Sequence, residues 1–167
     1  FLGKNNNKEI DKGWYHQSFL KSKGKKNKLN FINDVEIINN GGVKVNIDDE
    51  QKKIFILKQN IDSNLIFKGG SLIDWEIFFE DKSKDAPKFI NDINGMTGCL
   101  NFLDMTVKNL KLNASGSKCE DSINFIRVNG YLDNLNISES KSDGFDADFS
   151  KLKINNIKIF DSGNDCI

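Results

Sequence analysis

The sequence Asp121-Ser122-Ile123-Asn124-Phe125 returns 22 residues later as Asp143-Gly144-Phe145-Asp146-Ala147, and it begins again after a further 22 residues at Asp165-Cys166-Ile167. One repeat earlier, Leu100-Asn101-Phe102 takes the place of Ile123-Asn124-Phe125. A repeat of this length is typical of stacked units, each of which buries its apolar face against its neighbours. The repeat therefore predicts a solenoid.

Each repeat also contains a second apolar run, at 107–112, 132–137 and 154–159. Shorter runs that alternate or cluster apolar residues between Asn, Gly and Asp occur upstream, at 35–37, 43–47, 54–57, 65–67 and 75–79. These runs read as strands, and two of them complete one 22-residue turn. No 3.6-residue apolar stripe follows residue 30, which excludes helical hairpins. We therefore predict an all-β fold.

The strand pattern resembles the right-handed parallel β-helix of pectate-lyase-like proteins. We expect this solenoid over residues 31–167, truncated at its C-terminal end, with a polar segment at 1–30 as a possible cap and a loop leaving the stack near 81–96. Six apolar residues are expected to point inward: Leu110, Leu112, Leu135, Ile137, Ile157 and Ile159. Asn109, Asn134 and Asn156 are expected to form a hydrogen-bonded amide ladder, as stacked amides do in cross-β structures.

Composition narrows the function classes. Lys plus Arg and Asp plus Glu are equal at 24 each, so no net charge favours nucleic acid or an anionic membrane. No apolar run approaches the ~20 residues that a membrane span needs. A signal peptide is absent or already removed. A Cys99–Cys119 bridge is geometrically possible, but small buried thiols are the favoured reading of these cysteines, and no zinc-binding spacing is present.

The recurring aspartates form an acidic corner with Asp121, Asp143 and Asp165 in one column. Glu120, Asp146, Asp148 and Asn164 lie close by in the sequence. Stacked turns would place these carboxylates about 5 or 10 Å apart. Three explanations stay open: a carboxylate pair for glycoside hydrolysis, a calcium site built from oxygen ligands, or ordinary turn residues.

The segments Ser142-Asp143-Gly144-Phe145-Asp146 and Gly163-Asn164-Asp165-Cys166-Ile167 resemble the signature of polygalacturonases, which hydrolyse pectin. The resemblance implies catalytic roles for Asp143 and Asp165. We expect their neighbours Asp146, Asp148 and Asn164 to bind substrate. Asn164 stands where that family has its general acid, and an amide has no titratable proton to donate. Whether the chain is an enzyme is thus left open. If it is one, we expect a polysaccharide hydrolase or lyase.

These observations predict a secreted or cell-surface β-helix that binds or processes polysaccharide. The alternative is a non-catalytic structural or adhesive β-helix. No cofactor is expected, although calcium is left open as a stabilising ion. The expected partner is a polysaccharide or other glycan rather than nucleic acid, and the oligomeric state is undetermined. Trp14 and Trp75 could stack on sugar rings, but a strand tryptophan such as Trp75 more often belongs to the core.

Overall fold

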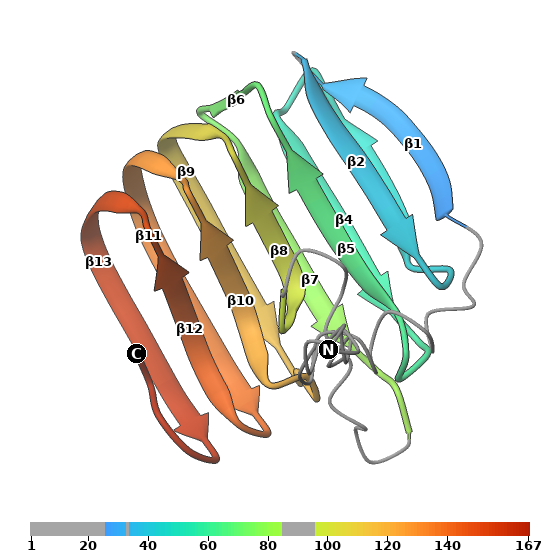
Figure 1. Cartoon of the computed structure of the whole chain (residues 1–167), viewed down its shortest axis with the longest axis vertical. Coiled ribbons are helices and arrows are strands. Elements are labelled where there is room, and N and C mark those ends of the chain that lie inside the picture. The colour runs from blue at the N-terminus through green and yellow to red at the C-terminus, as the bar shows by residue number, and fades with distance from the viewer. Residues whose placement is uncertain (1–25, 33, 85–95) are drawn as a thin grey trace, which may run out of the picture.

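A computed structural model describes residues 26–32, 34–84 and 96–167 of the chain. Every regular element among these residues is a β-strand, and the strands form two sheets arranged as facing layers (Figure 1). None of the described residues belongs to a helix long and apolar enough to cross a membrane. Residues 1–25 of the possible cap and residues 85–95 of the expected loop lie outside the described residues.

Sheet A contains, in spatial order, β1 (Lys26–Ile32), β2 (Val35–Asn40), β5 (Asn64–Lys68), β8 (Gly98–Leu103), β10 (Asp121–Ile126) and β12 (Asp143–Asp148). Sheet B contains β13 (Lys151–Ser162), β11 (Asn129–Ser140), β9 (Thr106–Ser115), β7 (Glu76–Asp81), β4 (Lys53–Lys58) and β3 (Lys44–Asp48), with β6 (Ser71–Ile73) beside β9.

Neighbouring strands from β4 onward are parallel and pair at the period seen in the sequence. In sheet A, Ile123 of β10 pairs with Leu100 on one side and with Phe145 on the other. In sheet B, Asn129 of β11 pairs with Thr106 and Lys151. Each turn thus adds one strand to each sheet, and about four turns stack at about 23 residues per turn. The predicted all-β parallel solenoid is confirmed.

One turn is longer than the others. Leu65 of β5 pairs with Leu100 of β8, 35 positions further on, whereas Leu100 pairs with Ile123, 23 positions further on. The extra residues fall between β7 and β8. The register of both sheets is otherwise preserved across this insertion, because β7 also pairs in parallel with β9.

The first strands depart from the parallel pattern. β1 pairs antiparallel with β2, β2 with β5, and β3 with β4. The expectation that the upstream strands already wind at the 22-residue period was wrong here, because Val45 and Ile56 belong to adjacent antiparallel strands of one sheet. The parallel solenoid therefore begins with β4, and an antiparallel layer precedes it.

The core lies between the two sheets and follows the predicted register. Leu110, Leu112, Leu135 and Ile137 are buried, as is Trp75, whose side chain belongs to this core. Ile159 packs partly against it, whereas Ile157 is 42% exposed. Ile157 pairs with the buried Leu135, and it lies on β13, the edge strand of sheet B, so no neighbouring turn covers it here.

Stacked aromatic rings run through the core along sheet A. The ring centroids of Phe67 and Phe102 are 5.1 Å apart, those of Phe102 and Phe125 4.5 Å, and those of Phe125 and Phe145 5.3 Å. These four residues come from successive turns. Phe67, Phe102 and Phe125 share one register position, and Phe145 lies two positions away, opposite Ile123. Contacts at such distances stabilise aromatic pairs beyond the area they bury.

The predicted amide ladder was placed on the wrong column. Asn134 and Asn156 pair in register, but β9 and β11 change register near Leu132, and Asn109 instead donates to Asp74 at 2.8 Å. Asn109 has φ +50, a left-handed conformation that Asn tolerates better than most residues. The hydrogen bond between side-chain amides of successive turns forms on another column, where Asn136 Nδ2 donates to Asn113 Oδ1 at 2.9 Å.

Sheet A passes to sheet B through a repeated left-handed residue. Asp104, Arg127 and Phe149 all have φ between +51 and +52 and occupy this turn on successive rungs. The Arg127 guanidinium binds both carboxylate oxygens of Asp104, at 2.5 and 3.1 Å. We call this turn the basic corner, because it carries Arg127, and it lies across the solenoid from the acidic corner.

Cys99 and Cys119 form a disulfide bond. The favoured prediction of buried free thiols was therefore wrong for this pair, and the bridge that spacing allowed is the one that forms. The two residues lie on neighbouring turns, where strand spacing brings their Cα atoms to 5.4 Å. Cys166 is free and exposed.

Candidate functional site

The turn from sheet B to sheet A brings the recurring aspartates together as expected. Asp121 and Asp143 begin β10 and β12 and pair directly in register. Asp165 lies on the following turn, because the amide of Gly144 donates to its carbonyl oxygen at 3.0 Å. The acidic corner is thus a real column of three aspartates on three successive turns.

Asp121 is the buried member of this column. Its side chain accepts hydrogen bonds from the Thr97 hydroxyl and from Asn124 Nδ2, and the residue is only 4% exposed. Burial, the largest cause, raises the pKa of Asp121 to about 6. The charges of Asp146 and Glu120 add to this rise, and the two hydrogen bonds oppose it. Asp121 therefore titrates close to neutral pH, but its burial keeps it from the surface where a polymer would bind.

Glu120 and Asp146 share this crowded environment. Burial raises the pKa of both, and the charge of Asp143 contributes to each rise. Asn124 Nδ2 lies 3.0 Å from a carboxylate oxygen of Asp146. Within the described part of the chain, no lysine or arginine forms an ion pair with Asp121 or its acidic neighbours. The corner is therefore a cluster of like charges without a described counter-charge.

Asp143, the first predicted catalytic residue, is held by donors of the next turn. One of its carboxylate oxygens accepts a hydrogen bond from Asn164 Nδ2 at 2.9 Å and another from the backbone amide of Asp165 at 3.1 Å. The side chain of Asp165 is exposed. Asn164 thus serves as a donor that orients Asp143, a positioning role that differs from the proton donor of a hydrolase.

Asp148 lies at the far end of β12 from Asp143, although its charge helps to raise the pKa of Asp146. It is the last residue of β12, five positions from Asp143, which corresponds to about 16 Å along an extended strand. Its carbonyl oxygen accepts from the amide of Arg127 at the basic corner. Asp146 and Asp148 follow the outer side of β12 and lead away from the corner, so the five predicted residues form a line rather than one cluster.

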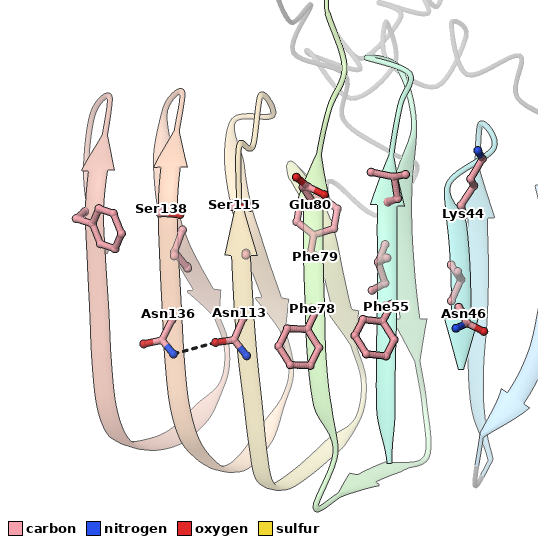
Figure 2. Close-up of a pocket in the computed structure, with 16 residues that line it drawn as sticks. Lys44, Asn46, Phe55, Phe78, Phe79, Glu80, Asn113, Ser115, Asn136 and Ser138 are labelled. Atoms are coloured by element: carbon pink, nitrogen blue, oxygen red, sulfur yellow. Dashed lines mark hydrogen bonds between the residues drawn. The ribbon is translucent and has the colours of Figure 1, made fainter. Parts of the chain in front are cut away.

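A separate hollow lies on the outer face of sheet B, and sequence analysis did not predict it. This outer groove has a volume of about 610 Å³ and crosses the strands (Figure 2). One row of outward side chains forms its floor in continuous register across five strands: Asn46, Phe55, Phe78, Asn113 and Asn136. Five strands span about 19 Å at the usual strand spacing.

Two phenylalanines occupy the centre of that floor. The rings of Phe55 and Phe78 lie side by side with centroids 5.1 Å apart and planes at 8° to each other. Figure 2 shows both rings broadside, beside the Asn113–Asn136 hydrogen bond. Phe55 is 43% exposed, which is unusual for a large apolar side chain in a regular strand. The groove therefore joins a flat aromatic surface to a row of amides.

A second row borders this floor and is more polar. It contains Lys44, Leu57, Glu80, Ser115 and Ser138, which are also in register. Phe160 continues the row on β13. Lys44 and Glu80 give the groove one charge of each sign, so the lining is neutral overall.

One signal in the sequence points to this groove. A strand with one face in the core alternates apolar and polar residues, but Ile54-Phe55-Ile56 and Ile77-Phe78-Phe79 are apolar throughout. Phe55 and Phe78 are 23 residues apart, one turn of the solenoid. An apolar residue that breaks the alternation at the repeat period indicates a second, outward-facing apolar site.

No known protein-family model, curated protein or solved structure matches this chain. The parallel β-solenoid is therefore established from the geometry of the strands alone.

Proposed function

We propose that this chain is a polysaccharide-binding β-solenoid, and that the glycan lies in the outer groove of sheet B. The observation that carries the proposal is the aromatic floor of Phe55 and Phe78, in register with the Asn113–Asn136 pair. Aromatic faces suit the apolar faces of sugar rings. Amide side chains offer both donors and acceptors to hydroxyl groups.

The shape and charge of the groove indicate the kind of glycan. Its floor repeats at every strand and runs for about 19 Å, which suits an extended chain of repeating units better than a single small molecule. Its lining contains one positive and one negative side chain, Lys44 and Glu80. We therefore propose an uncharged polysaccharide as the ligand, rather than the acidic pectin chain that the polygalacturonase resemblance implies.

The residues of the acidic corner favour a binding protein over a hydrolase. The carboxyl group with the most strongly raised pKa, Asp121, is buried, and Asp143 is engaged by two donors of the next turn. The residue at the general-acid position of the resembling family, Asn164, carries no titratable proton. A secreted or cell-surface location is part of the proposal, and the Cys99–Cys119 disulfide supports it, because such bonds persist in oxidising compartments.

Affinity electrophoresis through gels that contain a soluble polysaccharide tests the proposal. Uncharged β-linked glucans, mannans and xylans form the panel, with polygalacturonate as the acidic comparison. We expect at least one uncharged glycan to retard the protein. The double variant Phe55→Ala with Phe78→Ala should weaken binding about tenfold or more, since each aromatic contact contributes about 0.5–1.5 kcal/mol.

Phe149→Asn is the matched control. Phe149 is another exposed phenylalanine, but it lies at the basic corner outside the groove, and Asn tolerates its left-handed conformation. This variant should bind as the wild type does. Retardation by no uncharged glycan, or equal retardation of the wild type and the double variant, would refute the proposal. Release of reducing ends from any of the polymers would restore the hydrolase hypothesis.

A further inference from the structure

A polar cluster lies inside the solenoid at the ends of β4 and β7. Lys58 Nζ is 2.8 Å from Asp81 Oδ2, and both side chains are fully buried. The other oxygen of Asp81 accepts from the amide and the hydroxyl of Ser83, at 2.9 and 2.6 Å. The Cys99–Cys119 disulfide lies against this pair, with Cys99 Sγ 3.6 Å from Asp81 Oδ2.

The two sulfur atoms and the Asp81 carboxylate form a compact set of metal-ligand atoms. One oxygen of Asp81 and the sulfurs of Cys99 and Cys119 all lie within 4.8 Å of one another. In a tetrahedral zinc site, bonds of about 2.0 Å to oxygen and 2.3 Å to sulfur place these two ligand atoms about 3.5 Å apart. The observed distance of 3.6 Å from Cys99 Sγ to Asp81 Oδ2 is close to this value.

Charge balance favours a divalent cation once the disulfide is open. In the oxidised state, the Lys58 ammonium neutralises the Asp81 carboxylate. Two thiolates would add two negative charges to this buried cluster, and a divalent cation would cancel them. Because uncompensated charge is costly in a protein interior, the thiolates and the cation stabilise each other.

We propose that reduction of the Cys99–Cys119 disulfide creates a binding site for a zinc-type divalent cation, with Cys99, Cys119 and Asp81 as ligands. A dithiol supplies two electrons: it is oxidised to its cyclic disulfide, and the protein S–S bond is broken. Two thiolates then bind the cation, and the two dithiol protons are released. The fourth position is left to water or a hydroxyl, as in other three-ligand sites.

The surroundings give access to this site and support for its ligands. Cys119 is partly exposed, so a reductant can approach the disulfide from the side of this residue. The Ser117 hydroxyl donates to Cys99 Sγ at 3.3 Å, and the amide of Lys118 donates to Asp81 Oδ2 at 3.1 Å. Such donors orient metal ligands in known sites. The inference is independent of the glycan-binding proposal, since the cluster is buried and the groove is external.

Co²⁺ titration of the whole chain tests the inference. The protein is reduced with a water-soluble phosphine, which takes its oxygen from water and becomes a phosphine oxide. We expect one equivalent of Co²⁺ to bind to the reduced protein with a thiolate-to-cobalt charge-transfer band and tetrahedral d–d bands. The oxidised protein should show neither band. Zn²⁺ should displace the cobalt and remove both bands.

Cysteine variants separate this site from other thiols. Cys166→Ser should leave the cobalt spectrum unchanged, because Cys166 is exposed and outside the cluster. Cys119→Ser should halve the charge-transfer intensity and weaken binding at least tenfold. The inference is overturned if reduced wild type binds no Co²⁺, whether or not circular dichroism shows that its sheets persist. It is also overturned if Cys166→Ser abolishes the spectrum or Cys119→Ser leaves it intact.

Discussion

Asp81 and Asp121 are both buried aspartates on neighbouring turns at the same edge of the solenoid, yet their surroundings are opposite. One oxygen of Asp81 accepts from the amide and hydroxyl of Ser83, and the other contacts the Lys58 ammonium and accepts from the amide of Lys118. Asp121 has a hydroxyl and an amide as donors, and its charged neighbours Glu120 and Asp146 are acids.

This difference shows how the same residue type takes a structural or a titratable role. A carboxylate beside a buried cation is stable as an anion, and the pair holds two strands together. A carboxylate buried among other acids retains its proton to a higher pH. In the second arrangement, protonation below about pH 6 removes one of the repelling charges.

Lys58→Met should be the most destabilising change. It leaves Asp81 buried without its counter-charge, and such losses cost about 3–5 kcal/mol in free energy of unfolding. Urea denaturation at pH 7 measures the effect. The double variant Lys58→Met with Asp81→Leu should recover much of the loss, because it buries no charge. A single variant within 1 kcal/mol of wild type would show that the pair is not buried as described.

Leu135→Ala measures the cost of truncating a buried apolar side chain, for comparison with the loss of the buried ion pair. Leu135 is fully buried in the stack, so truncation should cost about 2–5 kcal/mol. Ile157→Ala is the matched control, since Ile157 pairs with Leu135 in register but is 42% exposed on the edge strand. The control should cost well under half as much. Equal losses, measured by the same urea series, would mean that another turn covers β13 in solution.

Asp121 should make the protein more stable as the pH falls toward 4. Its folded pKa of about 6 exceeds the unfolded value of 3.8, so the folded state binds more protons between these values and stability decreases as the pH rises through this window. The difference corresponds to about 3 kcal/mol. Asp121→Asn should flatten this dependence and raise stability at pH 7. Urea midpoints from pH 4 to pH 8 measure the pH dependence and the stability at pH 7. If the variant keeps the same slope of stability against pH, groups other than Asp121 cause that slope.

The repeat in the sequence predicts the parallel solenoid. It does not predict the antiparallel first strands, the outer groove or the buried ion pair. Parallel stacking from β4 onward follows from apolar residues that recur every 22 or 23 positions. Only a register that aligns these residues on successive turns buries all of them in one core. The antiparallel pairing of β3 with β4 could not be predicted, because alternation is the same in both kinds of sheet. The acidic column was predictable from spacing alone. The ion pair of Lys58 with Asp81 was not, because nothing in either local sequence marks these residues as buried.

The smallest expected effect comes from salt. Glu120, Asp143, Asp146 and Asp148 raise one another's energy by like-charge repulsion, which salt screens over about 10 Å at 0.1 M. Raising NaCl from about 0.01 to 0.5 M at pH 7.5 should therefore increase stability by about 1 kcal/mol or less. At pH 4 the increase should shrink, because protonation has already removed part of the repulsion.

Two variants check the origin of the salt response. Asp146→Asn should reduce the response at pH 7.5. Asp104→Asn removes the partner of Arg127 and should enlarge the response, because screening then no longer weakens an attractive pair. An equal salt response at both pH values would show that the corner is neutralised in the folded protein, as Asp81 is.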